Sequence, residues 1–151
     1  MKRHVVLATI GALVLAALTT DRIATGQSAP APALDFEFFK TRVQPIFMAK
    51  RPGHARCVSC HIDGTPLRLQ PFSAGRTTWN DEESRKNFET TRRVAKPGDA
   101  KSRLLVHALA EQAGGDFYHN GGKHWSSQND PEWRILRAWV LGETKSGSEQ
   151  R

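Results

Sequence analysis

The sequence contains few residues with sulfur. Two cysteines, Cys57 and Cys60, occur in 151 residues, so a framework of several disulfides is excluded. A zinc site built from two cysteine pairs is also excluded, because there is no second pair. The two methionines are Met1 and Met48, so no thioether side chain follows residue 48. A metal ligand supplied by the second half of the chain must therefore be a residue other than methionine.

No stretch shows the strict alternation of apolar and polar residues that predicts a β-strand, whereas helical spacing recurs. The predicted fold class is therefore all-α. Helices are expected at 35–49 with a kink or restart at Pro45, at 57–61, at 81–95, at 99–110 with Asp99 as its cap, and at 130–142. Loops are expected at 62–80 and 113–129. The last helix has the clearest limits, since Asp130 and Pro131 suit its start and Gly142 its end.

The N-terminus has the organisation of a secretory signal. Lys2 and Arg3 precede an uncharged apolar run of 14 residues at 5–18, which is shorter than the ~20 residues of a membrane span. We predict a signal peptide at 1–26, a Pro/Ala-rich linker at 27–34, one domain at 35–143 and a flexible tail at 144–151. The predicted location is periplasmic, after export; an uncleaved N-terminal anchor is the alternative. Cleavage would lower the net charge from +7 to +5, because three basic residues and one acidic residue leave.

The central motif is Cys57-Val58-Ser59-Cys60-His61, a C-x-x-C-H sequence. Two thiols at this spacing can each form a thioether bond to one vinyl group of a porphyrin, and the next residue supplies an imidazole to the iron. The motif therefore predicts one covalent haem c, with His61 as the proximal iron ligand. A thioredoxin-like redox site would need a βαβ context, which the sequence lacks.

The motif lies between an aromatic first helix ending in VQPIF and a last helix containing WRILRAWVLG. This arrangement resembles class I cytochromes c, and the runs LRLQPF and PGDAKSRLL make residues 36–142 similar to the cytochrome c-like domains of planctomycete and acidobacterial proteins. The resemblance implies a helical fold wrapped around one haem. Class I cytochromes take a methionine from the loop before the last helix, and this chain has none there.

The same loop contains His119, between glycines, and the resemblance implies a distal ligand near this position. We therefore predict His119 as the distal iron ligand, with His124 and His107 as alternatives and Met48 as a core residue. An iron without a second protein ligand remains open. Imidazole on both faces favours Fe(III) and hence a low reduction potential.

The predicted function is single-electron transfer between redox partners, not catalysis. Two alternatives stay open: a haem subunit of a larger exported oxidoreductase or respiratory complex, and a haem-based binder or sensor of small ligands. The positive charge favours partners with acidic docking surfaces, or association with a membrane complex. Nucleic acid is not expected as a partner, because no basic stripe with interleaved aromatic residues is present.

Overall fold

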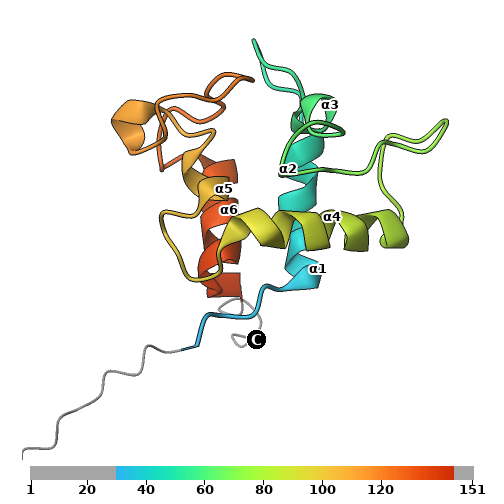
Figure 1. Ribbon diagram of the computed structural model, residues 1–151, viewed down its shortest axis with the longest axis horizontal. Coiled ribbons are helices and arrows are strands. Elements are labelled where there is room, and N and C mark those ends of the chain that lie inside the picture. The colour runs from blue at the N-terminus through green and yellow to red at the C-terminus, as the bar shows by residue number, and fades with distance from the viewer. Residues whose placement is uncertain (1–29, 145–151) are drawn as a thin grey trace, which may run out of the picture.

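The computed structural model describes residues 30–144. This part of the chain is helical and contains no strand, and one isolated bridge pairs Leu109 with Trp125. The all-α prediction is confirmed. In chain order the helices are α1 (Phe36–Phe38), the π-helix η1 (Phe39–Val43), α2 (Gln44–Met48), α3 (Cys57–Cys60), α4 (Asp81–Ala95), α5 (Arg103–Val106), the 3-10 helix η2 (Glu111–Ala113) and α6 (Pro131–Leu141) (Figure 1).

The predicted first helix is present as three consecutive pieces, α1, η1 and α2. Asp35 caps its start by accepting a hydrogen bond from the Phe38 N–H at 2.9 Å. Pro45 has no N–H to donate to the preceding turn, and α2 begins with this proline in its first turn, directly after the wider π-helical turn. The chain stays helical through Pro45, and the irregularity next to this proline is the π-helical turn that precedes it.

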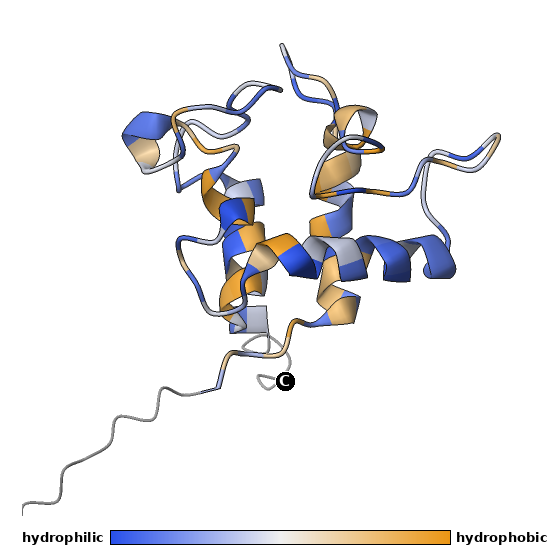
Figure 2. Ribbon diagram, in the orientation of Figure 1, coloured by the Kyte–Doolittle hydropathy of each residue, from blue (hydrophilic) through white to orange (hydrophobic). Residues whose placement is uncertain are grey.

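Helix α4 has the predicted limits, and its ends and faces are unusually polar. A capping box closes its start: the Asn80 side chain accepts from the Glu83 N–H, and the Glu83 carboxylate accepts from the Asn80 N–H. Its buried side includes Ser84, Asn87 and Thr91, all fully buried. Figure 2 shows little apolar colour along α4 before its C-terminal end. This helix therefore offers hydrogen bonds to the segments that pack on it.

Helix α6 also begins and ends as predicted. The Asp130 side chain accepts from the N–H groups of Glu132 and Trp133, Pro131 is the first helical residue, and Gly142 ends the helix with a φ of 74°. A Cβ at Gly142 would lie 2.5 Å from the Cβ of Pro32, so glycine is required both by the backbone angle and by this close packing.

The core is an aromatic centre where the first helix, α4 and α6 meet. The rings of Phe39 and Trp139 are 5.3 Å apart, and the Phe88 ring lies 5.4 Å from Phe39 and 6.0 Å from Trp139. The Trp139 indole N–H donates to the Asp35 carbonyl at 2.8 Å. Met48 packs against this core, as the sequence predicted. Residues near the two ends of the domain are therefore fixed against each other.

The predicted helix at 99–110 is wrong in its extent and its cap. Only Arg103–Val106 is α-helical, and the Asp99 side chain closes a turn by accepting from the Lys101 N–H. The reason is a competing backbone pairing: Ala110 N–H donates to Trp125 O, and His124 N–H donates to Ala108 O, both at 2.8 Å. This pairing brings the loop that contains the histidines against the chain that follows α5.

The predicted signal peptide lies outside the described residues, as does most of the predicted tail. Among the helices of residues 30–144, none is both long enough and apolar enough to cross a membrane.

Candidate haem-binding site

The C-x-x-C-H motif forms the short helix that the sequence predicted. α3 spans Cys57–Cys60, and the His61 N–H donates to the Cys57 carbonyl at 3.0 Å. Buried Val58 anchors the turn, while Cys57 is half-buried and Cys60 is exposed. Both thiols are free, and their i,i+3 spacing places them on one face of the turn.

His61 is oriented by contacts at its Nδ1 atom. Its Nδ1 lies 2.9 Å from the Leu67 carbonyl and 3.0 Å from the Thr65 hydroxyl, which itself donates to Leu67 O at 2.6 Å. A carbonyl can only accept, so Nδ1 carries the proton and Nε2 keeps its lone pair for a metal. The orienting carbonyl lies in the loop at 62–80, directly after the motif.

The segment after His61 is attached to α4 through polar groups. Leu69 is buried, and its N–H donates to the His61 carbonyl. The Gln70 N–H donates to the Asn87 side-chain oxygen at 2.7 Å, and the Arg68 N–H donates to the Thr90 hydroxyl at 3.2 Å. The polar buried face of α4 thus holds the residues that orient His61. We call residues 61–70 the proximal segment.

The structure places the His119 ring next to the His61 ring. Their rings are nearly parallel, with an interplanar angle of 15° and centroids 6.3 Å apart. An imidazole nitrogen bonds a transition metal at about 2 Å and lies about 1.1 Å from its ring centre, so two imidazoles on opposite sides of one metal have centroids about 6 Å apart. The observed centroid spacing of the histidine pair matches this distance, with the two rings stacked nearly parallel.

His119 is oriented by the same kind of bond as His61. Its Nδ1 lies 2.6 Å from the Gly122 carbonyl, three residues along the chain, so Nε2 is again the nitrogen available to a metal. Gly121 allows the close turn, since a Cβ there would lie 3.2 Å from the His119 ring. The loop at 114–124, which we call the distal loop, therefore holds His119 by local contacts.

His107 is close to His119 but already has partners on both ring nitrogens. The centroids of these two rings are 4.9 Å apart, while His107 Nδ1 lies 2.8 Å from an Asp116 oxygen and Nε2 lies 3.3 Å from the Arg103 guanidinium. Its geometry suits a role as a support for the distal loop. Lys123 adds to this support by donating to the carbonyls of His107 and Asp116.

His124, the other alternative ligand, lies beside His54 rather than opposite His61. The ring centroids of His54 and His124 are 4.6 Å apart, and His124 Nδ1 is buried without a hydrogen-bond partner. Burial, and then the nearby His54 and Arg51, lower the pKa of His124 to about 4. The structure places His54 half-buried against the distal loop.

Burial also affects the residues that would bind the haem. It lowers the pKa of His61 and of His119 below the ordinary value, so both imidazoles are neutral and available as ligands near pH 7. Burial raises the pKa of the Cys57 thiol, against the opposing effect of the Arg51 guanidinium. The two histidines therefore do not lose a proton when they bind a metal.

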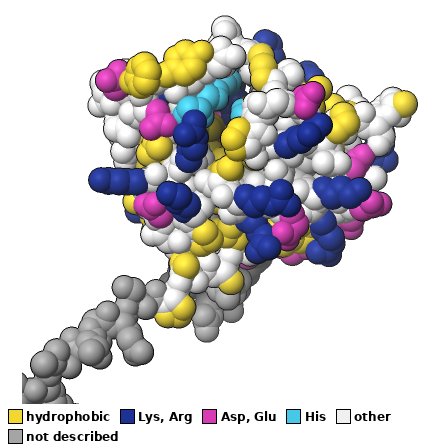
Figure 3. All heavy atoms as spheres, viewed as in Figure 1, with side chains coloured by type: hydrophobic (Ala, Val, Ile, Leu, Met, Phe, Trp, Pro, Cys, Tyr) yellow, Lys and Arg dark blue, Asp and Glu magenta, His cyan; other side chains and the backbone are white. Residues whose placement is uncertain are grey.

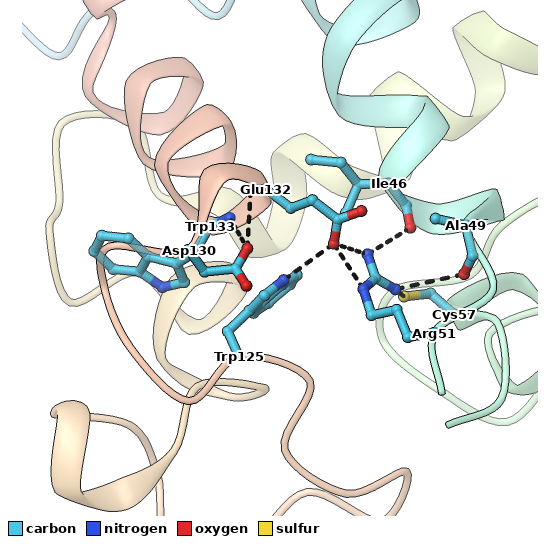
Figure 4. A network of polar contacts seen from close by, with 8 residues as sticks. All are labelled: Ile46, Ala49, Arg51, Cys57, Trp125, Asp130, Glu132 and Trp133. Carbon is cyan, nitrogen blue, oxygen red and sulfur yellow. Dashed lines mark hydrogen bonds and ion pairs between the residues drawn. The ribbon is translucent and has the colours of Figure 1, made fainter. Parts of the chain in front are cut away.

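A network that sequence reasoning missed connects Cys57 to α6. Arg51 donates through Nε to Glu132 at 2.6 Å, and its other nitrogens contact the Ile46 carbonyl and the Cys57 sulfur, the latter at 3.9 Å (Figure 4). The Trp125 indole N–H donates to the same Glu132 oxygen at 3.3 Å. Arg51 and Glu132 are 81 positions apart, and no local pattern marks them as partners.

The donor set contains two neighbouring imidazoles and two thiols. In residues 30–144, no group of three or more His, Cys, Asp or Glu side chains is arranged to hold a metal. Two facing imidazoles are sufficient only if other ligands complete the coordination, as the four nitrogens of a haem do. The residues present therefore fit a haem, with Cys57 and Cys60 beside one of the two histidines.

Comparisons of this chain with models of protein families, with curated proteins and with solved structures found no match, so the interpretation of the site rests on its own residues.

Proposed function

We propose that the chain is an exported c-type cytochrome with one haem that carries single electrons between redox partners. The observation that carries this proposal is the facing pair His61 and His119, with His61 directly after two free thiols on α3. Covalent attachment needs no further side chain: each thiol adds across one vinyl group, with sulfur bonding to one carbon and hydrogen to the other. The bound haem iron would supply a one-electron Fe(III)/Fe(II) couple.

The chain's own residues would keep the iron from binding substrates. His61 and His119 would both hold the iron through Nε2, and each is itself held by a backbone carbonyl through Nδ1. With no open position, only the electron remains to be exchanged. Imidazole on both faces stabilises Fe(III) relative to a histidine–methionine pair, so we expect a low potential.

A test of this function compares His119→Ala with His107→Gln in the mature haem-loaded protein. We expect His119→Ala to produce a high-spin ferrous haem that binds CO, because the distal imidazole is gone. His107→Gln is the matched control: it removes a neighbouring imidazole that already has other partners, and the spectrum should stay low-spin. A low-spin His119→Ala protein that does not bind CO would contradict His119 as the ligand.

One observation favours a haem-based ligand binder as the second candidate. His119 is held by a carbonyl only three residues away, and its loop exposes Phe117 at 84%. A loop held this locally can move away from an iron more easily than the proximal segment can. Rapid CO binding by the unmodified ferrous protein would favour this second candidate over electron transfer.

A further inference from the structure

The surface over α4 contains a basic groove that lies outside the proposed haem site. The groove has a volume of about 380 Å³ and lies between α4 and the proximal segment. Its charged lining consists of Arg68, Arg85, Lys86, Arg93 and Glu89, four cations against one carboxylate. Figure 3 shows Lys and Arg side chains in a band across this face of the molecule, with histidine atoms exposed beside the band.

The positive side chains of the groove differ in whether a nearby carboxylate already pairs with them. Glu89 is paired with Arg92, which lies outside the groove, at 2.6 Å. Arg68 is 3.1 Å from Asp63, but both side chains are more than half exposed, so this ion pair is weak. Arg85 lies 4.4 Å over the Phe36 ring, which orients the guanidinium without cancelling its charge. Lys86 is paired with Glu82 at 2.7 Å, so the net positive charge of the groove is carried mainly by its three arginines.

The groove is directly connected to the proximal histidine. Arg68 follows Leu67, whose carbonyl accepts the hydrogen bond from His61 Nδ1. The Arg68 N–H is in turn bonded to Thr90 of α4, which also lines the groove. A molecule bound in the groove would therefore contact the segment that orients His61, one residue away from the orienting carbonyl.

We propose that this groove is the docking site for an acidic redox protein; the proposal rests on the proposed function of electron transfer. Guanidinium groups bind carboxylates through two parallel hydrogen bonds, so three arginines suit a surface of Asp and Glu side chains. An anionic membrane suits this face less well, because adsorption also needs apolar side chains. The large exposed apolar side chains of the described residues, Ile62, Phe117 and Tyr118, do not line the groove.

The test uses Arg68→Gln with Arg93→Gln, two exposed side chains, in the haem-loaded mature protein. The probe is reduced flavodoxin, a small acidic redox protein, and stopped-flow absorption follows reduction of the haem. At low ionic strength we expect the double variant to react about three- to tenfold more slowly than the unmodified protein, because two attractive charges are removed. Added salt should slow the unmodified protein and reduce this difference.

The matched control is Arg42→Gln with Arg134→Gln, which removes the same charge from a second groove, between α1 and α6. This variant should react at nearly the unmodified rate. Equal slowing of the two variants, or no slowing in either, would overturn the proposal. So would binding to phosphatidylglycerol vesicles that Arg68→Gln with Arg93→Gln abolishes, since the groove would then be a membrane site. Failure of the proposed function would look different from failure of the docking proposal. In that case the haem would be absent, or dithionite would not reduce it.

Discussion

The two histidines of the pair are held by different parts of the chain, although their orienting bonds are alike. His61 belongs to the proximal segment, which is tied to α4 through Asn87 and Thr90 and contains buried Leu69. His119 belongs to the distal loop, whose orienting carbonyl at Gly122 is three residues away. The proximal side is therefore tied to the core through Leu69 and α4, and the distal side is a surface loop with a few supports. This difference predicts that perturbations of the two sides have unequal effects.

The largest effect is expected from removing the covalent attachment on the proximal side. Cys57→Ser with Cys60→Ser should leave no haem bound to the denatured chain, because neither thioether can form. Haem staining of a denaturing gel measures this, and Ser59→Ala, at the exposed position between the cysteines, is the control. A stained band for the double variant would show that the attachment is elsewhere.

The proximal segment should be sensitive to a change in α4. Asn87→Ala removes the acceptor of the Gln70 N–H in a fully buried position, and we expect the free energy of unfolding to fall by about 2 kcal/mol. Chemical denaturation measures the change. Glu89→Ala, at an exposed position on the same helix, should cost about 0.5 kcal/mol or less. Equal losses of unfolding free energy in Asn87→Ala and Glu89→Ala would mean that the polar face of α4 does not hold the proximal segment.

The distal loop should respond to Lys123→Met with a smaller loss of stability. The ammonium group bonds the carbonyls of His107 and Asp116, and its loss should cost about 1 kcal/mol. Because the loop is then less firmly held, we also expect the ferrous variant to bind some CO, measured by absorption spectroscopy, whereas the unmodified protein binds none. Lys101→Met serves as the control. If Lys123→Met destabilises the protein more than Asn87→Ala does, the proposed difference between the two sides is wrong.

The smallest effect concerns the start of α4. The Ser73 hydroxyl and then the Asn80 N–H lower the pKa of Glu83, so its contribution to stability is present above the ordinary pKa of 4.5 and is lost as pH falls through the lower folded value. Glu83→Gln should therefore lower Tm slightly at pH 7 and make no difference at strongly acidic pH. Glu82→Gln is the neighbouring control. A difference in Tm between Glu83→Gln and the unmodified protein that grows as pH falls would contradict the lowered pKa of Glu83.

Much of the fold could be predicted because its signals are local. Asp130, Pro131 and Gly142 defined α6 from adjacent positions, and the C-x-x-C-H motif placed α3. The extent of α5 could not be predicted, since Ala108 and Ala110 pair with residues of the distal loop instead of continuing the helix.

In the candidate site, too, local features could be predicted from the sequence and long-range contacts could not. The motif, the missing methionine and the resemblance together predicted His61 and His119 as a ligand pair, and the structure places their ring centroids 6.3 Å apart. The contact between Arg51 and Glu132 depends on how the two ends of the domain pack, and the polar face of α4 becomes informative only when the proximal segment lies on it. The sequence provides no local pattern for such long-range contacts.

The most direct test is the optical spectrum of the purified mature protein in both oxidation states, with and without CO, combined with its intact mass. We expect one covalent haem per chain that is low-spin in both oxidation states and has no methionine–iron charge-transfer band. Its spectrum should not change when CO is added. A chain without covalent haem, or a high-spin ferrous haem that binds CO at once, would contradict the proposed function.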